Sequence, residues 1–285
     1  MKDILTETRE IMKKYNIKAN KNLGQNFLIN DEAIEKIVES SDITSKDLVI
    51  EIGPGLGTLT KKLLEKAGKV ICIELDPKMI KIINDRFNSY KNFEVLHQDI
   101  LKVDLNKIIE EEKNKGIIEK VKIVANLPYY ITTPIIMQLL ENNLPIESIT
   151  VMIQKEVADR LIEIPGGKNT GAITYAIYYY CTSEKILEVE NNSFIPEPEV
   201  TSEVIKLNIR KNPPIDGSNK EILFDIIKKA FMQRRKTLLN SLVNSKVFLN
   251  KEDGIKVLNE LNIDINIRPE KLTLSDFAKI ANKLA

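Results

Sequence analysis

The chain has 285 residues, of which 43% are hydrophobic and 29% charged, a balance typical of a globular protein with one large domain or two smaller ones. Its 42 Lys and Arg residues nearly equal its 41 Asp and Glu residues, so the net charge of +1 indicates no class of partner. Two Cys residues exclude a disulfide framework or cysteine-rich zinc site, and a single histidine, His97, excludes a multi-histidine metal centre. The first thirty residues lack the apolar core of a signal peptide, and no apolar run reaches the roughly 18 residues of a membrane span. We therefore expect a cytoplasmic protein.

The order of hydrophobic patterns predicts an α/β domain built on a doubly wound parallel sheet. An amphipathic stretch over residues 4–15 and a basic, Asn-rich loop over residues 18–26 come first. Helices and short buried strands then alternate, as they do in βαβ units. Helices are expected at Asp31–Ser40, Thr58–Ala67, Pro77–Phe87 and Thr133–Glu141, and strands at Asp47–Ile52, Lys69–Leu75, Phe93–His97, Val121–Ala125, Ser148–Ile153, Lys185–Val189 and Glu203–Ile209, the last two as an antiparallel pair at one edge.

The clearest linker in the chain is the segment Lys211–Asn219, which concentrates proline, glycine and turn-forming residues. Beyond it, apolar residues recur only at helical spacing. We therefore predict an α/β domain over residues 1–211 and a small all-helical domain over residues 212–285.

A glycine-rich loop, Glu51–Gly57, follows the first predicted strand of the sheet and reads E-x-G-x-G-x-G. Glycines at such a turn let a ligand approach the backbone closely. The third glycine comes one position too early for the G-x-G-x-x-G fingerprint of NAD-binding proteins. The pattern instead favours an S-adenosylmethionine (SAM) enzyme with a Rossmann-like sheet, and Gly53 and Gly55 are the predicted cofactor contacts.

Two acidic residues follow the next two predicted strands. Glu74 lies twenty-one positions after Gly53, where a carboxylate can accept hydrogen bonds from both ribose hydroxyls of a nucleoside. Asp99 lies just beyond the third strand, where it can accept from an adenine amino group. The alternative interpretation is a glycine turn beside surface acids. It is less favoured, because the loop and both acids lie at three successive strand ends.

The segment Asn126-Leu127-Pro128-Tyr129 follows the fourth predicted strand, which lies beside the first in a doubly wound sheet. An adenine amino nitrogen is a poor nucleophile because its lone pair is conjugated into the ring. Acceptors for its hydrogens, from the Asn126 side chain and a backbone carbonyl near Leu127, would draw it toward tetrahedral geometry while Tyr129 stacks on the base. Methyl transfer then depends on orientation and electrostatics and needs no metal. The alternative is a proline turn with a core tyrosine.

Five ordered segments carry a resemblance to the ribosomal small-subunit (16S) rRNA adenine dimethyltransferases, called KsgA or RsmA in bacteria. The chain is identified as a member of this kasugamycin-sensitivity methylase family over essentially its whole length. The segments are Asn22–Leu28, Glu51–Gly57, Asn126–Tyr129, Phe194–Val200 and Gln233–Leu238.

The resemblance implies that the chain uses SAM to dimethylate N6 of two adjacent adenosines in a hairpin near the 3′ end of small-subunit rRNA, during ribosome biogenesis. It implies that Asn26 and Leu28 help to close the SAM pocket, and that Tyr129 and Phe194 sandwich the flipped adenine. Two departures bear on RNA contacts or loop shape and not on the methyl-transfer centre: Glu199 stands where the family usually has lysine, and Asn169–Ala172 replaces a more usual Tyr-Gly.

A basic stretch in the predicted helical domain is the expected RNA contact. Seven Lys and Arg residues lie between residues 226 and 251 with no acidic residue among them, and Arg234, Arg235 and Lys236 are adjacent. An RNA substrate favours phosphate contacts for these three, whereas the alternative is a solvated helix face.

Three other functions fit the sequence less well. A large-subunit rRNA adenine methylase of the antibiotic-resistance type typically reads Asn-Ile-Pro-Tyr and lacks the Gln-Arg-Arg-Lys-Thr-Leu segment. A non-catalytic RNA-binding assembly factor is disfavoured by the intact glycines and Asn126, and DNA adenine methylation by the whole-chain resemblance. The expected partner is thus the small ribosomal subunit, with no membrane or DNA partner.

Overall fold

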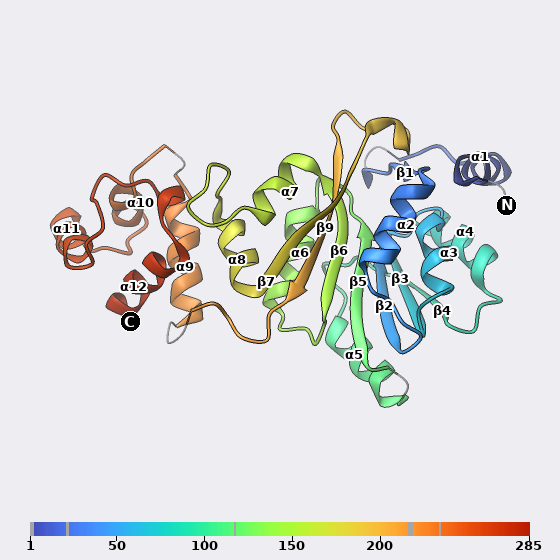
Figure 1. Ribbon diagram of the computed structural model, residues 1–285, viewed down its shortest axis with the longest axis horizontal. Helices are drawn as coiled ribbons and strands as arrows, with labels where there is room; N and C mark the ends of the chain where they lie inside the picture. The colour runs from blue at the N-terminus through green and yellow to red at the C-terminus, as the bar shows by residue number, and fades with distance from the viewer. Residues whose placement is uncertain (1–2, 21–22, 117, 216–218, 234) are drawn as a thin grey trace. The chain divides into compact units, whose positions relative to one another are not determined.

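The computed structural model describes the whole chain except residues 1–2, 21–22, 117, 216–218 and 234 (Figure 1). Two positions of the sequence motifs, Asn22 and Arg234, therefore lie outside the described residues. Contact between Cα atoms divides the chain into two compact units. The first comprises residues 1–158 and 183–209, and the second comprises residues 159–182 and 210–285.

The first unit is built on a mixed sheet. Within the described residues, seven strands lie in the order β4-β3-β2-β5-β6-β9-β7. Strand β2 pairs in parallel with both β3 and β5, so the direction of winding reverses beside it. The strands are β2 (Asp47–Ile52), β3 (Lys69–Glu74), β4 (Phe93–His97), β5 (Lys120–Asn126), β6 (Ser148–Gln154), β7 (Cys181–Val189) and β9 (Ser202–Ile209).

This order confirms the predicted doubly wound sheet. In such sheets ligands bind beyond the carboxyl ends of the strands, at the point where the strand order reverses. Here that point lies between the ends of β2 and β5. Strand β9 pairs antiparallel with β6 and lies beside β7 at one edge, so the last two predicted strands do form that edge.

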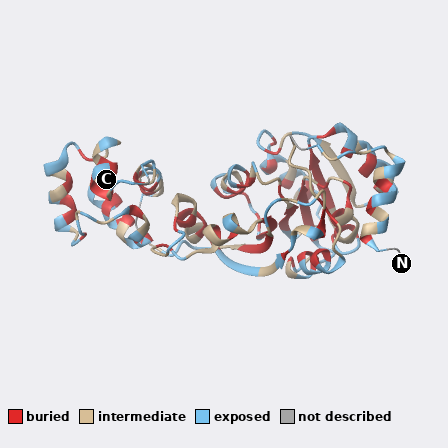
Figure 2. Ribbon diagram, turned by 90° about the horizontal axis from the view of Figure 1, so that it is seen from above, coloured by how far each residue is buried: buried red, intermediate tan, exposed pale blue. Residues whose placement is uncertain are grey.

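Helices pack on the sheet with their apolar faces inward. Figure 2 shows buried strands between helices whose outer faces are exposed. The helices of this part of the chain are α1 (Ile4–Lys14), α2 (Asp31–Ser40), α3 (Thr58–Leu64), α4 (Pro77–Phe87), α5 (Leu105–Asn114), α6 (Thr132–Glu141) and α7 (Lys155–Ile162). Outside the main sheet, the two-residue strands β1 (Phe27–Leu28) and β8 (Phe194–Ile195) pair antiparallel.

The second unit is helical and contains α8 (Ala172–Tyr180), α9 (Lys220–Ala230), α10 (Leu238–Asn244), α11 (Lys251–Glu260) and α12 (Leu274–Leu284). Its main segment starts at Arg210, beside the boundary that the linker predicts at residue 211. It also includes residues 159–182, which the sequence pattern places in the α/β domain. Residues 159–182 belong to this unit because Tyr175 of α8 is fully buried among its helices. The Tyr175 hydroxyl donates to the carbonyls of Pro269 and Leu272.

Candidate functional site

The glycine loop, residues 53–57, connects β2 to α3 with three glycines in left-handed backbone conformations. The φ angles of Gly53, Gly55 and Gly57 are +67°, +55° and +79°, a region that side chains with a Cβ rarely adopt. A Cβ built on Gly53 would meet no atom within 4 Å, so this backbone is open to a ligand. A Cβ built on Gly57 would lie 2.5 Å from the ring of Phe87, so this glycine is required by packing.

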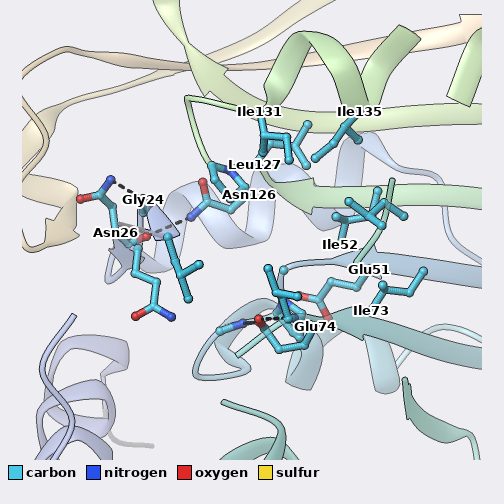
Figure 3. A pocket seen from close by; sticks show the side chains of 18 of the residues that line it. Gly24, Asn26, Glu51, Ile52, Ile73, Glu74, Asn126, Leu127, Ile131 and Ile135 are labelled. Carbon is cyan, nitrogen blue, oxygen red and sulfur yellow. Dashed lines mark hydrogen bonds between the residues drawn. The ribbon is translucent and has the colours of Figure 1, made fainter. Parts of the chain in front are cut away.

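Glu74 lies at the end of β3 with its carboxylate against the glycine loop (Figure 3). Its Oε1 accepts from the backbone N–H groups of Leu75 (2.7 Å) and Asp76 (2.8 Å), and its Oε2 accepts from the N–H of Gly55 (3.2 Å). Burial raises the pKa of this carboxyl above its usual value, while these backbone hydrogen bonds oppose the shift. The side chain is thus held in one position, and Oε2 keeps a lone pair for a ligand.

Asp99 lies beyond β4 and lines the same pocket as Glu74. Its Oδ1 accepts from the N–H of Leu101 at 3.0 Å, and its Oδ2 lies 3.8 Å from Lys102 Nζ. The apolar side chains of Leu75 and Ile100 line the pocket beside these two acids. Neither Leu75 nor Ile100 was predicted from the sequence to be a site residue, although each directly follows an acidic residue that was.

Asn126, the last residue of β5, is oriented by the segment that contains Asn26. Asn126 Nδ2 donates to the backbone carbonyl of Asn26 at 3.1 Å, as Figure 3 shows. The amide oxygen Oδ1 is consequently turned toward other groups as an acceptor. Leu127 donates its N–H to the Met152 carbonyl at 3.1 Å, and within the described chain its own carbonyl accepts no hydrogen bond.

Tyr129 lines the pocket, and its hydroxyl lies 2.6 Å from Ser202 Oγ. Burial raises the pKa of this phenol above its usual value. Phe194 behaves differently: it is 2% exposed, belongs to the core cluster that also contains Leu28, and is not among the pocket-lining residues. The structure therefore brings Tyr129, but not Phe194, to the pocket wall.

The other residues predicted for the α/β domain come together in one pocket. It is lined by the predicted cofactor residues Asn26, Leu28, Gly53, Gly55, Glu74, Asp99 and Asn126, together with Leu127 and Tyr129. These residues come from five separate parts of the chain, so the pocket is a product of the fold and not of one local motif.

Glu51, the first residue of the glycine motif, is a second buried acid in the pocket wall. It is 2% exposed, and burial raises its pKa from 4.5 to about 7. Its Oε2 accepts from Thr60 Oγ1 at 2.6 Å and from Cys72 Sγ at 3.4 Å. The motif itself marks this position, but the sequence predicted no role for it.

The predicted RNA contacts lie in the helical unit. Arg235 and Lys236 are exposed in the turn between α9 and α10, and not within a helix as the pattern suggested. The third member of the set, Arg234, is outside the described residues. Among the described residues, no group of His, Cys, Asp and Glu side chains could hold a metal ion, and no described helix is long and apolar enough to cross a membrane.

Comparison with known proteins gives consistent matches over nearly the whole chain. A profile of the family described as "Ribosomal RNA adenine dimethylase" matches residues 16–285. A Clostridioides difficile protein named "Ribosomal RNA small subunit methyltransferase A" is 47% identical over 96% of this chain and 94% of its own length. A Bacillus pumilus protein of the same name is 44% identical over 99% of this chain and 98% of its own length.

A solved structure is similar at the level of both sequence and fold. The crystal structure of a dimethyladenosine transferase from Plasmodium falciparum has a TM-score of 0.74 and 28% identity, and the match covers 90% of this chain and 96% of that one. The 23S rRNA methyltransferase ErmE has a TM-score of 0.68 at 23% identity, which shows a shared fold only. The profile match and the curated relatives together show that the chain belongs to the ribosomal RNA adenine dimethylase family.

Proposed function

We propose that the protein transfers methyl groups from SAM to N6 of two adjacent adenosines in a hairpin near the 3′ end of 16S rRNA, within the small ribosomal subunit. The observation that carries this proposal is the orientation of Asn126. Its Nδ2 is committed to the Asn26 carbonyl, so Oδ1 is available to accept from a substrate amine.

The pocket residues fit SAM. Glu74 offers a fixed carboxylate for the ribose hydroxyls, Asp99 an acceptor for the adenine amino group, and Gly53 an unobstructed backbone. The apolar side chains of Leu75 and Ile100 suit the faces of an adenine ring. When bound, SAM supplies an electrophilic methyl group on a sulfonium. The residues of this chain orient the two reactants and exclude water.

Asn126 and Leu127 prepare the nucleophile. Asn126 Oδ1 and the Leu127 carbonyl can each accept one hydrogen of the adenine amine, which localises the nitrogen lone pair and leaves it free to attack the methyl carbon. As the C–N bond forms, the bond between the methyl carbon and the sulfonium sulfur would break, S-adenosylhomocysteine would leave as the neutral thioether, and the methylated nitrogen would release one proton to solvent. A monomethylated amine still has one hydrogen, so a single acceptor is enough to orient it for the second transfer.

Other residues hold the RNA in this proposal. Tyr129 offers a ring face to the flipped adenine, and stacking of this kind contributes about 1–3 kcal/mol per base. Phe194 is the second aromatic residue of the proposed sandwich, and its side chain is buried in this structure. Arg234, Arg235 and Lys236 are the proposed phosphate contacts.

A large-subunit target is the nearest alternative. The curated relatives at 44–47% identity carry the small-subunit name, whereas the 23S enzyme shares the fold at 23% identity. The segment Asn126-Leu127-Pro128-Tyr129 also differs from the Asn-Ile-Pro-Tyr typical of the large-subunit enzymes.

The test uses radiolabelled SAM with three acceptors: small subunits that lack the modification, large subunits and DNA. Nucleoside analysis after digestion should find label in N6,N6-dimethyladenosine from small subunits alone. Transfer to large subunits, or label confined to monomethyladenosine, would contradict the proposal.

A further inference from the structure

A side chain outside every sequence motif also holds the glycine loop, by donating a hydrogen bond to one of its backbone carbonyls. Arg86, in the last turn of α4, donates through Nη1 to the carbonyl of Leu56. The same peptide unit is held at its other end, because the N–H of Gly57 donates to the Pro54 carbonyl at 2.9 Å. Arg86 thus completes the hydrogen bonding of the Leu56–Gly57 peptide.

This peptide needs such support because of its neighbours. Gly55 and Gly57 flank Leu56, both have positive φ, and glycine has low barriers to other backbone conformations. Rotation of the Leu56–Gly57 peptide would break the Pro54–Gly57 turn and change the shape of the SAM pocket floor. The hydrogen bond from Arg86 to the Leu56 carbonyl opposes that rotation.

Arg86 is itself fixed by the N-terminal helix. Its Nη2 donates to Oε1 of Glu7 on α1, and its side chain is 13% exposed. The second oxygen of Glu7 lies 3.2 Å from Lys61 Nζ on α3. Glu7 therefore connects α1 to both α3 and α4.

Apolar contacts join the same elements. Ile11 of α1, Phe27 of β1, Leu56 of the glycine loop and two residues of α4 form one core cluster. A Cβ built on Gly55 would lie 3.3 Å from the ring of Phe27. The loop is thus packed against the N-terminal segment that also supplies the Asn26 carbonyl to Asn126.

We propose that Arg86 is a positioning residue for SAM: it holds the Leu56 carbonyl, Glu7 holds its guanidinium, and the docking of α1 thereby sets the affinity of the pocket. This inference rests on the proposed use of SAM. Neither side chain is among those that line the pocket, so both act through the glycine loop.

The experiment measures SAM binding by calorimetry, and KM and kcat with RNA, for Arg86→Lys, Glu7→Gln and the control Lys61→Ala. Arg86→Lys keeps the charge but cannot span both acceptors, and Glu7→Gln keeps the shape but removes the charge. Each should raise the Kd and KM for SAM roughly tenfold, as expected for one charge-assisted hydrogen bond, with kcat at saturating SAM and KM for RNA near wild type. Lys61→Ala removes the other partner of Glu7 and should leave the Kd for SAM within about twofold of the wild type.

The double variant Glu7→Gln/Arg86→Lys should bind SAM no more weakly than Arg86→Lys alone, because both changes act through the same carbonyl. A lowered melting temperature with an unchanged Kd for SAM would reduce Arg86 to a purely structural residue and overturn the proposal. If Arg86→Lys does not fold, the Kd of Glu7→Gln for SAM tests the proposal by the same criterion. Because the Kd is measured without RNA, the result is independent of which RNA the enzyme methylates.

Discussion

At the scale of single residues, the two ends of the Asn126 amide have different roles. Nδ2 donates to the Asn26 carbonyl and fixes the rotamer, and Oδ1 is the proposed acceptor for the target amine. We expect Asn126→Ala to abolish dimethyladenosine formation while leaving SAM affinity largely intact, because the acceptor acts on the substrate. Single-turnover assays measure the first quantity and calorimetry the second. Turnover near that of the wild type would contradict the proposed mechanism.

Glu74 combines a structural role with the proposed ribose contact, and both depend on its carboxylate. Glu74→Gln keeps the side-chain size and one acceptor oxygen but loses the charge. SAM binding should weaken by about 1.5–3 kcal/mol, the usual contribution of a hydrogen bond to a charged group. Calorimetry measures this loss, and NAD should show no binding to the wild type. Unchanged SAM affinity, or micromolar NAD binding, would refute the assignment.

Glu51 makes stability depend on pH. Its pKa is raised from 4.5 to about 7, so the folded state binds a proton more tightly than the unfolded state. The contribution of Glu51 to the free energy of unfolding is fully present below pH 4.5. It falls by about 3 kcal/mol as the pH rises through 7. We expect Glu51→Gln to raise the melting temperature at pH about 7.5 but not at pH about 4.5. The exposed residue Glu65 gives the control Glu65→Gln, which should show no such difference, and equal effects of Glu51→Gln at both pH values would be inconsistent with a raised pKa.

At the scale of elements, the sequence predicted the helices and strands whose ends are marked by capping or turn residues. Helix α4 begins at Pro77 after Asp76, whose side chain accepts from the Lys78 N–H, and the prediction matches its bounds. Strands β1 and β8 were missed, because two residues are too few to show alternation. Helix α5 was missed because its buried face, Leu105, Ile109 and Glu112, includes an acid.

The same limits apply to the site. The sequence identified residues that line the pocket, such as Glu74 and Asn126, because their chemistry is distinctive at strand ends. It did not identify Arg86, which acts on a backbone carbonyl thirty positions away in the chain. Nor could it show that Phe194 is buried, since burial depends on the pairing of β8 with β1.

The junction of the glycine loop with α4 gives an element-scale prediction. At Gly57 a methyl group would collide with Phe87 and the positive φ would be strained, whereas at Gly53 only the φ is unfavourable. Gly57→Ala should therefore destabilise the protein by about 2–4 kcal/mol and Gly53→Ala by about 1–2 kcal/mol. Chemical denaturation measures both, and equal losses would show that Phe87 moves aside without cost.

At the scale of the whole molecule, the chain passes between the two units at three points, and the predicted linker lies beside one of them. The crossing near residue 210 precedes a segment rich in proline and glycine, which marks it. The other crossings, between residues 158 and 159 and between 182 and 183, lie inside α7 and β7. Regular elements that continue across a boundary carry no change in composition, so only the core position of Tyr175 reveals it.

The helical unit provides the last prediction, because its proposed role in RNA binding rests on charge alone. Arg235 and Lys236 are exposed in a turn and form no ion pair with a described residue, whereas Lys279 in the same unit lies 3.4 Å from Asp276. If the first two neutralise rRNA phosphates, changing both to Ala should weaken binding to the small subunit and flatten the plot of log affinity against log salt. The slope should fall by about 0.7–0.9 for each phosphate that is no longer neutralised, and further when Arg234 is changed as well.

Lys279→Ala should change the slope less, since an acid already neutralises that cation. SAM affinity should stay constant in every variant, because the SAM pocket is formed by residues of the other unit. An unchanged slope in a folded double variant would leave Arg235 and Lys236 as ordinary solvated surface residues.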